Sequence, residues 1–81
     1  MSEALVAYLA AHRRFETLDR ERDALLEPID SGEATALSPE QQALLRLLSS
    51  EQLAVYQLAQ VAERNLSPQE RAQLQAAGLT L

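Results

Sequence analysis

The sequence contains no cysteine, no tryptophan and no lysine, and it has only two glycines and one histidine. Without cysteine, the chain cannot form a disulfide scaffold, a thiolate metal site or a cysteine nucleophile. Two widely separated glycines, Gly32 and Gly78, are too few for a glycine-rich phosphate loop. These absences exclude disulfide-stapled secreted domains and loop-type nucleotide-binding proteins.

Residues that favour β-strands are also scarce, because valine, isoleucine and threonine together number seven and aromatic residues make up 4%. Sixteen leucines and fourteen alanines dominate instead, accompanied by glutamate, glutamine and arginine, which are all strong helix formers. The 81 residues are about half the usual length of one domain. The sequence therefore predicts one all-α domain, a small antiparallel helical bundle of three to four helices with a long first helix.

Positive charge is in the minority, with seven basic residues against twelve acidic ones and a net charge of −5. A general nucleic-acid or anionic-membrane binder needs a cationic surface, so we expect neither partner. The longest apolar run, Ala4 to Ala11, is far below the ~20 residues that span a bilayer. It follows Glu3 and precedes basic residues, the opposite order to a secretory signal. We expect a soluble, cytoplasmic protein.

The first helix is expected at about residues 2–27, with Ser2 as its cap and Pro28 as its end. Its residues repeat at alternating spacings of four and three, which predicts a heptad seam. The seam comprises Ala4, Tyr8, Ala11, Phe15, Leu18, Arg22, Leu25 and Ile29, widened by Leu5, Leu9 and Leu26. Arg22 is the misfit, and we expect its stem to pack while its charged head stays in water.

A loop is expected at residues 28–38, followed by a helix at about residues 39–65. Ser38 and Gln41 form a predicted capping box, with Pro39 at the first helical position. The helix carries its apolar residues on one arc. These residues are Leu44, Leu47, Leu48, Ala54, Val55, Leu58, Val61 and Ala62.

Two features predict a kink or short break near Ser49, which leaves one helix or two over residues 39–65. Glu51 falls inside the apolar arc, and Ser49 to Gln52 reads as a second capping box. A further start signal at Ser67 predicts a short helix at about residues 68–77, ended by Gly78.

Residues capable of chemistry are few. His12 and Glu16 lie one helical turn apart, but two ligands make a weak metal site and no third accompanies them. We expect His12 to lie beside the seam and to bond water or Glu16. No serine is placed in an activated turn. The sequence therefore predicts no catalytic residue, no metal and no cofactor.

The densest basic cluster is interleaved with acidic residues, so residues 13–23 carry no net charge. Neighbours three and four positions apart predict a ladder of ion pairs along one helix face. The predicted pairs are Arg13–Glu16, Glu16–Arg20, Asp19–Arg22 and Arg20–Asp23. We interpret this face as solvated rather than as a phosphate site, although the same charges could steer a partner helix.

Two stretches resemble FliT-type flagellar export chaperones. Phe15 to Leu26 is similar to the signature of their second helix, an aromatic followed by Leu-x-x-Glu, a basic residue and a leucine pair. Leu44 to Leu48, followed by Leu53, Leu58, Arg64 and Leu66, is similar to their third helix.

The resemblance implies a small bundle that binds an amphipathic segment of an export substrate, with a short C-terminal helix able to cover the groove. By position, it implies that the groove is lined by Phe15, Leu18, Leu25, Leu48, Val55 and Leu58.

The apolar content leaves several functions open. A chain of this size buries only ~60–65% of its surface, so its stripes can form a groove for a partner helix or the core of a homodimer. We expect a non-catalytic protein-binding module, an adaptor or export-chaperone-like protein. The alternative is a phage or bacterial regulator acting on a protein or DNA, with residues 39–65 as a helix-turn-helix. An enzyme subunit or small metal-binding bundle is the third hypothesis.

Overall fold

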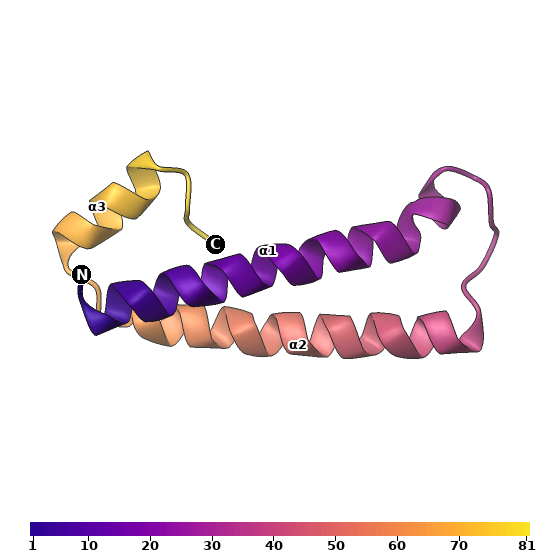
Figure 1. Cartoon of the computed structure of the whole chain (residues 1–81), viewed down its shortest axis with the longest axis horizontal. Coiled ribbons are helices and arrows are strands. Elements are labelled where there is room, and N and C mark those ends of the chain that lie inside the picture. Colours follow the sequence, from indigo (N-terminus) through magenta and orange to yellow (C-terminus); the bar gives the residue numbers. More distant parts are fainter.

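The computed structural model describes all of residues 1–81 and contains three α-helices and no strand. Helices α1 (Glu3–Asp30) and α2 (Pro39–Arg64) run antiparallel side by side, and α3 (Pro68–Ala76) folds back over the N-terminal part of α1 (Figure 1). The predicted all-α class and small antiparallel bundle are confirmed. Because one helix pair runs the whole length, the molecule is elongated, with extents of 47 × 21 × 14 Å.

A serine caps the N-terminus of every helix. The hydroxyls of Ser2, Ser38 and Ser67 accept hydrogen bonds from the backbone N–H three residues later, at 3.1, 3.2 and 3.1 Å. In α2 and α3 the bond is reciprocal, because the side chains of Gln41 and Glu70 accept from the N–H of the capping serine. The predicted start signals of α2 and α3 are therefore confirmed, since each satisfies backbone donors that the helix itself cannot.

The prediction that the first helix ends at Pro28 is wrong. Helix α1 continues through Pro28 to Asp30. Proline removes only its own N–H from the ladder, and the N–H of Ser31 still donates to the carbonyl of Glu27 at 2.8 Å. Ile29 is half-buried, so the extra turn remains packed. The connecting loop is correspondingly shorter than predicted.

The prediction of a break near Ser49 is also wrong, because α2 is one uninterrupted helix. Glu51 does not force a break although it falls in the apolar arc, because its carboxylate lies 2.9 Å from Arg14 Nη2 on α1. Gln52 is buried and hydrogen-bonded to α1. The helix-turn-helix hypothesis for residues 39–65 is wrong for the same reason, because it requires two helices where the structure has one.

The core lies along the contact between α1 and α2. All eight residues of the predicted α1 seam are buried or half-buried, so that seam is confirmed. Leu18 is fully buried, yet only nine residues of the chain are buried in all. Five of them form a cluster at the α3 end: Tyr8, Ala59, Ala62, Leu66 and Leu74.

Two hydrogen bonds add to the apolar cluster in attaching helix α3 and the C-terminal tail to α1. Ser2 Oγ donates to Glu70 Oε2 at 2.6 Å, and the N–H of Leu81 donates to the hydroxyl of Tyr8 at 3.0 Å. The hydrogen bond from Ser2, together with those from Ser67, lowers the pKa of the exposed Glu70 carboxyl. Gly78 follows the helix with φ +70°, the left-handed conformation predicted for it.

Candidate functional site

Helix α2 leaves one apolar face uncovered. The exposed fraction is 65% for Leu58, 57% for Leu47 and 53% for Val61. These residues belong to a row with spacings of three and four, which we call the α2 stripe. The α2 stripe comprises Leu44, Leu47, Glu51, Ala54, Leu58 and Val61. Such spacing is that of a helix-packing seam, so α2 carries a second seam beside the one that contacts α1.

The single apolar arc predicted for α2 is therefore divided between two environments. Leu48 and Ala62 are buried and Val55 is half-buried on the side that packs against α1. The α2 stripe occupies the adjacent part of the same arc, and its apolar members are all exposed. One neighbouring helix covers only about one such seam, so an arc this wide exceeds what α1 can bury.

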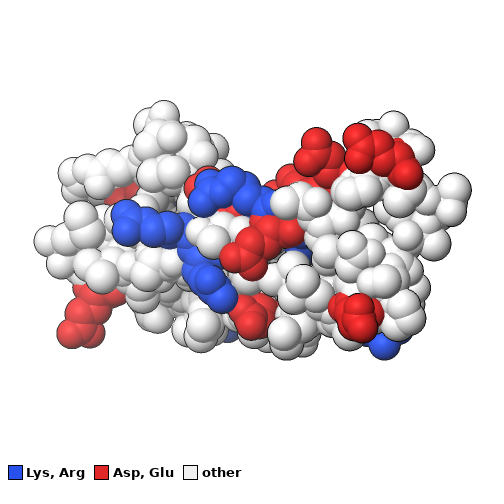
Figure 2. All heavy atoms as spheres, turned by 45° about the vertical axis from the view of Figure 1, so that its right-hand side comes forward, with Lys and Arg blue, Asp and Glu red and all other residues white.

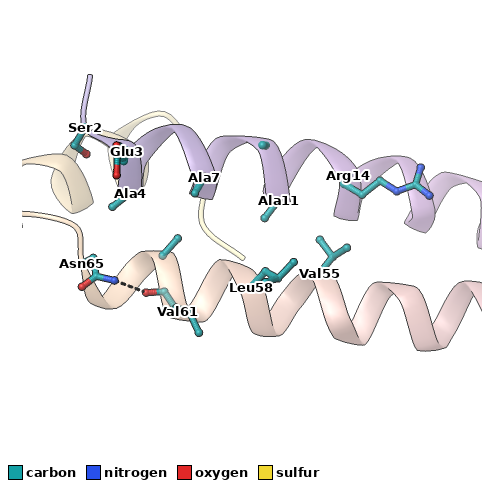
Figure 3. A pocket seen from close by; sticks show the side chains of 12 residues that line it. Ser2, Glu3, Ala4, Ala7, Ala11, Arg14, Val55, Leu58, Val61 and Asn65 are labelled. Carbon is teal, nitrogen blue, oxygen red and sulfur yellow. Dashed lines mark hydrogen bonds between the residues drawn. The ribbon is translucent and has the colours of Figure 1, made fainter.

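A groove lies beside the stripe, between the N-terminal half of α1 and the C-terminal half of α2. Its volume is about 880 Å³. The α1 side presents alanines and the α2 side presents branched side chains, several of which point toward one another in Figure 3. The apolar lining consists of Ala4, Ala7, Ala10, Ala11, Val55, Leu58, Val61 and Ala62. The hollow exists because alanine methyl groups leave room that larger side chains would fill.

One polar side chain at each end of the groove is hydrogen-bonded within the chain. Arg14 Nη2 donates to Glu51 Oε2 at 2.9 Å, with both side chains about half exposed. At the opposite end, Asn65 Nδ2 donates to the backbone carbonyl of Val61 at 3.2 Å, the dashed line in Figure 3. The one charge of the α2 stripe is thus paired within the chain, and an exposed pair of this kind contributes about 0–1 kcal/mol.

A second polar bridge crosses the helix pair near its middle. Gln52 is buried, its Oε1 accepts from Arg22 Nη1 at 2.7 Å, and its Nε2 donates to Asp19 Oδ1 at 3.1 Å. The prediction that the head of Arg22 stays in water is wrong, because Gln52 binds it and its Nε is buried without a partner. This bridge pairs one guanidinium nitrogen of Arg22, the misfit in the α1 seam, with α2.

The predicted ladder of ion pairs along α1 is not formed. None of its four pairs comes within 4.0 Å, and the chain's two close charge contacts are Arg14–Glu51 and His12–Glu16. Basic and acidic side chains still gather together at mid-length on the face in Figure 2. Holding long exposed side chains in one geometry costs entropy that a weak pair does not offset.

His12 is buried rather than merely beside the seam. It lies next to Tyr8, with ring centroids 6.4 Å apart, and its Nδ1 is 3.6 Å from Glu16 Oε1. That distance is too long for the predicted hydrogen bond to Glu16. No group of three or more His, Cys, Asp or Glu side chains in the chain is arranged to hold a metal ion.

The groove residues implied by the chaperone resemblance are distributed over different environments. Leu18 and Leu48 lie in the core, so their assignment to a binding surface is wrong. Val55 and Leu58 do line the groove. The packing of α1 against α2 leaves no room for a ligand at Leu18 and Leu48.

Phe15 and Leu25 are half-buried and also lie outside the groove. Phe15 packs on Tyr56, with ring centroids 6.2 Å apart, in a separate hollow. Helix α3 does not line the groove either, so it does not cover it as the resemblance implies. Leu44 and Leu47 were missed as surface residues, although their spacing to Leu58 and Val61 already marks the second seam.

None of the three helices has the combination of length and hydropathy that crossing a membrane requires. Comparisons of this chain with protein-family models, curated proteins and solved structures found no match.

Proposed function

We propose that this protein is a non-catalytic interaction module of the cytoplasm that binds an amphipathic helix along the α2 stripe and the adjoining groove. The observation that carries the proposal is the row of exposed apolar side chains on a helix whose other apolar side already packs against α1. The outer face of a solvated helix normally carries polar residues, and contiguous exposed apolar patches mark interaction sites.

The shape of the surface supports a helical partner. Counted from Leu44, apolar residues at i, i+3, i+10, i+14 and i+17 along α2 match the spacing with which one helix recognises another, and only the i+7 position, Glu51, is charged. Burying one exposed leucine contributes about 1.5–3 kcal/mol, so a few such anchors suffice for binding. An adaptor acts in this way. The two stretches similar to FliT-type proteins favour an export-chaperone-like role, in which the helix belongs to an export substrate.

A binding assay with a synthetic helix tests the proposal. A fluorescent amphipathic peptide of about three heptads, with leucine at its core positions, is titrated with the protein and followed by anisotropy. We expect saturable binding that weakens about tenfold or more in Leu47→Arg.

Leu53→Arg is the matched control, because Leu53 lies on α2 outside the stripe and is 58% exposed, against 57% for Leu47. Equal binding by the two variants, or no binding by the unchanged protein at a concentration at which it is monomeric, contradicts the proposal.

A further inference from the structure

The chain exposes more surface than a compact protein of its size. Its accessible surface is 5749 Å², whereas a folded monomer of 8.9 kDa is expected to expose about 4,800 Å². The excess is comparable to the ~800 Å² that each partner buries in a stable dimer. The molecule as a whole therefore exposes enough surface beyond that of a compact monomer for a second copy to cover.

We infer that the α2 stripe binds the α2 stripe of a second copy, so that two chains form an antiparallel, two-fold symmetric four-helix bundle. The inference rests on the proposed function, because it names the amphipathic helix that the stripe takes up. Two-fold dimers bury the same patch on both subunits, so the patch must complement itself when its direction is reversed.

The α2 stripe has this property. Its spacings, three, four, three, four and three, read the same in both directions. An axis between Glu51 and Ala54 places Leu44 of one copy beside Val61 of the other, and Leu47 beside Leu58. Each Glu51 then faces a small Ala54. Large apolar residues thus meet large apolar residues on both sides of the axis, as in an antiparallel helical seam.

The positions of the groove and of the projecting side chains also favour antiparallel pairing. The groove adjoins Leu58 and Val61, at the C-terminal half of α2. Leu44 and Leu47 are exposed at the N-terminal half, where no comparable hollow lies beside them. Antiparallel pairing places the projecting leucines of each copy over the alanine-floored groove of the other. Parallel pairing instead places the two grooves against each other, so the projecting Leu44 and Leu47 of neither copy lie over a groove.

The charged residues on and beside the α2 stripe also favour antiparallel pairing. Parallel pairing places Glu51 directly against Glu51 of the second copy, whereas antiparallel pairing offsets the two by three residues, about 4.5 Å along the helix, and leaves each beside its own Arg14. On the outer flank, Ser50 of one copy faces Gln57 of the other. Near each end, Glu40 of one copy comes within one helical turn of Arg64 of the other. No like charges meet directly, which a stable helical interface requires.

The oligomeric state is the first test. Sedimentation equilibrium or native mass spectrometry of the full chain is expected to give twice 8.9 kDa. Each interface change occurs twice in a two-fold dimer, so Leu47→Arg is expected to raise the dimer dissociation constant about a hundredfold or more. Leu53→Arg is expected to leave it unchanged. A monomer at every concentration, or equal effects of the two variants, overturns the inference.

The chain contains no cysteine, so introduced thiols report the register. Mild oxidation of Leu44→Cys/Val61→Cys is expected to give a covalent dimer, because the two positions face each other across the seam. Leu44→Cys alone is expected to remain uncrosslinked. Crosslinking of Leu44→Cys alone indicates parallel pairing and contradicts the antiparallel bundle.

These outcomes separate the inference from the proposed function. If the protein is monomeric but binds the synthetic peptide through Leu47, the stripe is a helix-binding surface whose occupant is another protein, and the second-copy inference fails alone. If the protein neither dimerises nor binds the peptide, both fail. If it dimerises through the stripe, an export substrate would have to compete with the second copy.

Discussion

Arg22 and Glu51 are the two charged residues that interrupt apolar seams, and each is hydrogen-bonded to the opposite helix. Arg22 donates to the buried Gln52, and Glu51 accepts from Arg14. The sequence shows that each charge falls in an apolar seam. It does not show which residue bonds to that charge, because the partners are 30 and 37 positions away in the chain. Buried polar groups are costly only when they are unpaired, so such bridges keep both helices continuous.

Gln52→Ala tests the bridge. We expect the free energy of unfolding to fall by about 1–3 kcal/mol, because Arg22 and Asp19 lose a buried partner. Urea unfolding followed by circular dichroism measures the change. Gln60→Ala, at an exposed position on the same helix, is the control and should change stability by less than about 0.5 kcal/mol. Equal midpoints for both variants would show that the bridge contributes nothing.

Glu70 gives a pH dependence to the attachment of α3. Hydrogen bonds from Ser2 and Ser67 lower its pKa in the folded state. Its contribution is therefore fully present above the ordinary glutamate pKa of about 4.3, and it is lost as pH falls through the lower folded-state value. We expect Glu70→Gln to destabilise the protein at neutral pH and to have less effect in acid.

Thermal unfolding of this variant at neutral pH and at about pH 3, below the ordinary glutamate pKa, measures the difference. Glu21→Gln is the control, because Glu21 is exposed in the middle of α1 and its side chain makes no hydrogen bond or ion pair within the chain. A Glu70→Gln effect that is as large in acid as at neutral pH would contradict this prediction.

At the scale of the helix, local signals located every start and the end of α3. Capping serines, prolines at first positions and a glycine with positive φ act within one turn, so they can be read from adjacent residues. The end of α1 and the continuity of α2 were predicted wrongly. Both depend on packing against the neighbouring helix, which compensates for Pro28 and for Glu51 in ways that local sequence does not contain.

Ser50→Pro distinguishes a continuous α2 from a broken one. If Ser49 capped a new helix, proline at position 50 would occupy the first helical position and cost little. In the uninterrupted helix it removes a hydrogen bond and clashes with the preceding turn, so we expect a loss of about 3 kcal/mol or more. Chemical denaturation measures the loss, and Ser50→Ala serves as the tolerated substitution. Near-equal stability of the two variants would indicate a break.

At the scale of the molecule, the elongated shape arises because α3 packs at only one end of the α1–α2 pair. The Cα radius of gyration is 15.8 Å, against about 12 Å for a compact domain of this length. Small-angle scattering of the Leu47→Arg variant, which should be monomeric, is expected to retain the elongated value. A radius near that of a compact domain would show that α3 and the helix pair rearrange when the stripe is changed.

The candidate site was only partly predictable. Leu58 and Val55 line the groove that the structure contains, whereas Leu18 and Leu48 lie in the core. All four are apolar residues at helical spacing, so composition and periodicity cannot distinguish them. The sequence identifies Leu44 and Leu47 as part of the apolar arc of α2 but does not show that they are exposed.

Helix content, helix starts and the heptad spacing of the seams follow from the sequence alone, because propensity, capping and periodicity are local properties. Tertiary packing decided which part of the wide apolar arc of α2 is buried, because that depends on how many neighbours the chain folds against it. Helix α1 covers one seam, α3 lies over the N-terminal part of α1, and the α2 stripe remains exposed. The surface that we propose binds a helix therefore exists because the chain has one helix too few to bury it.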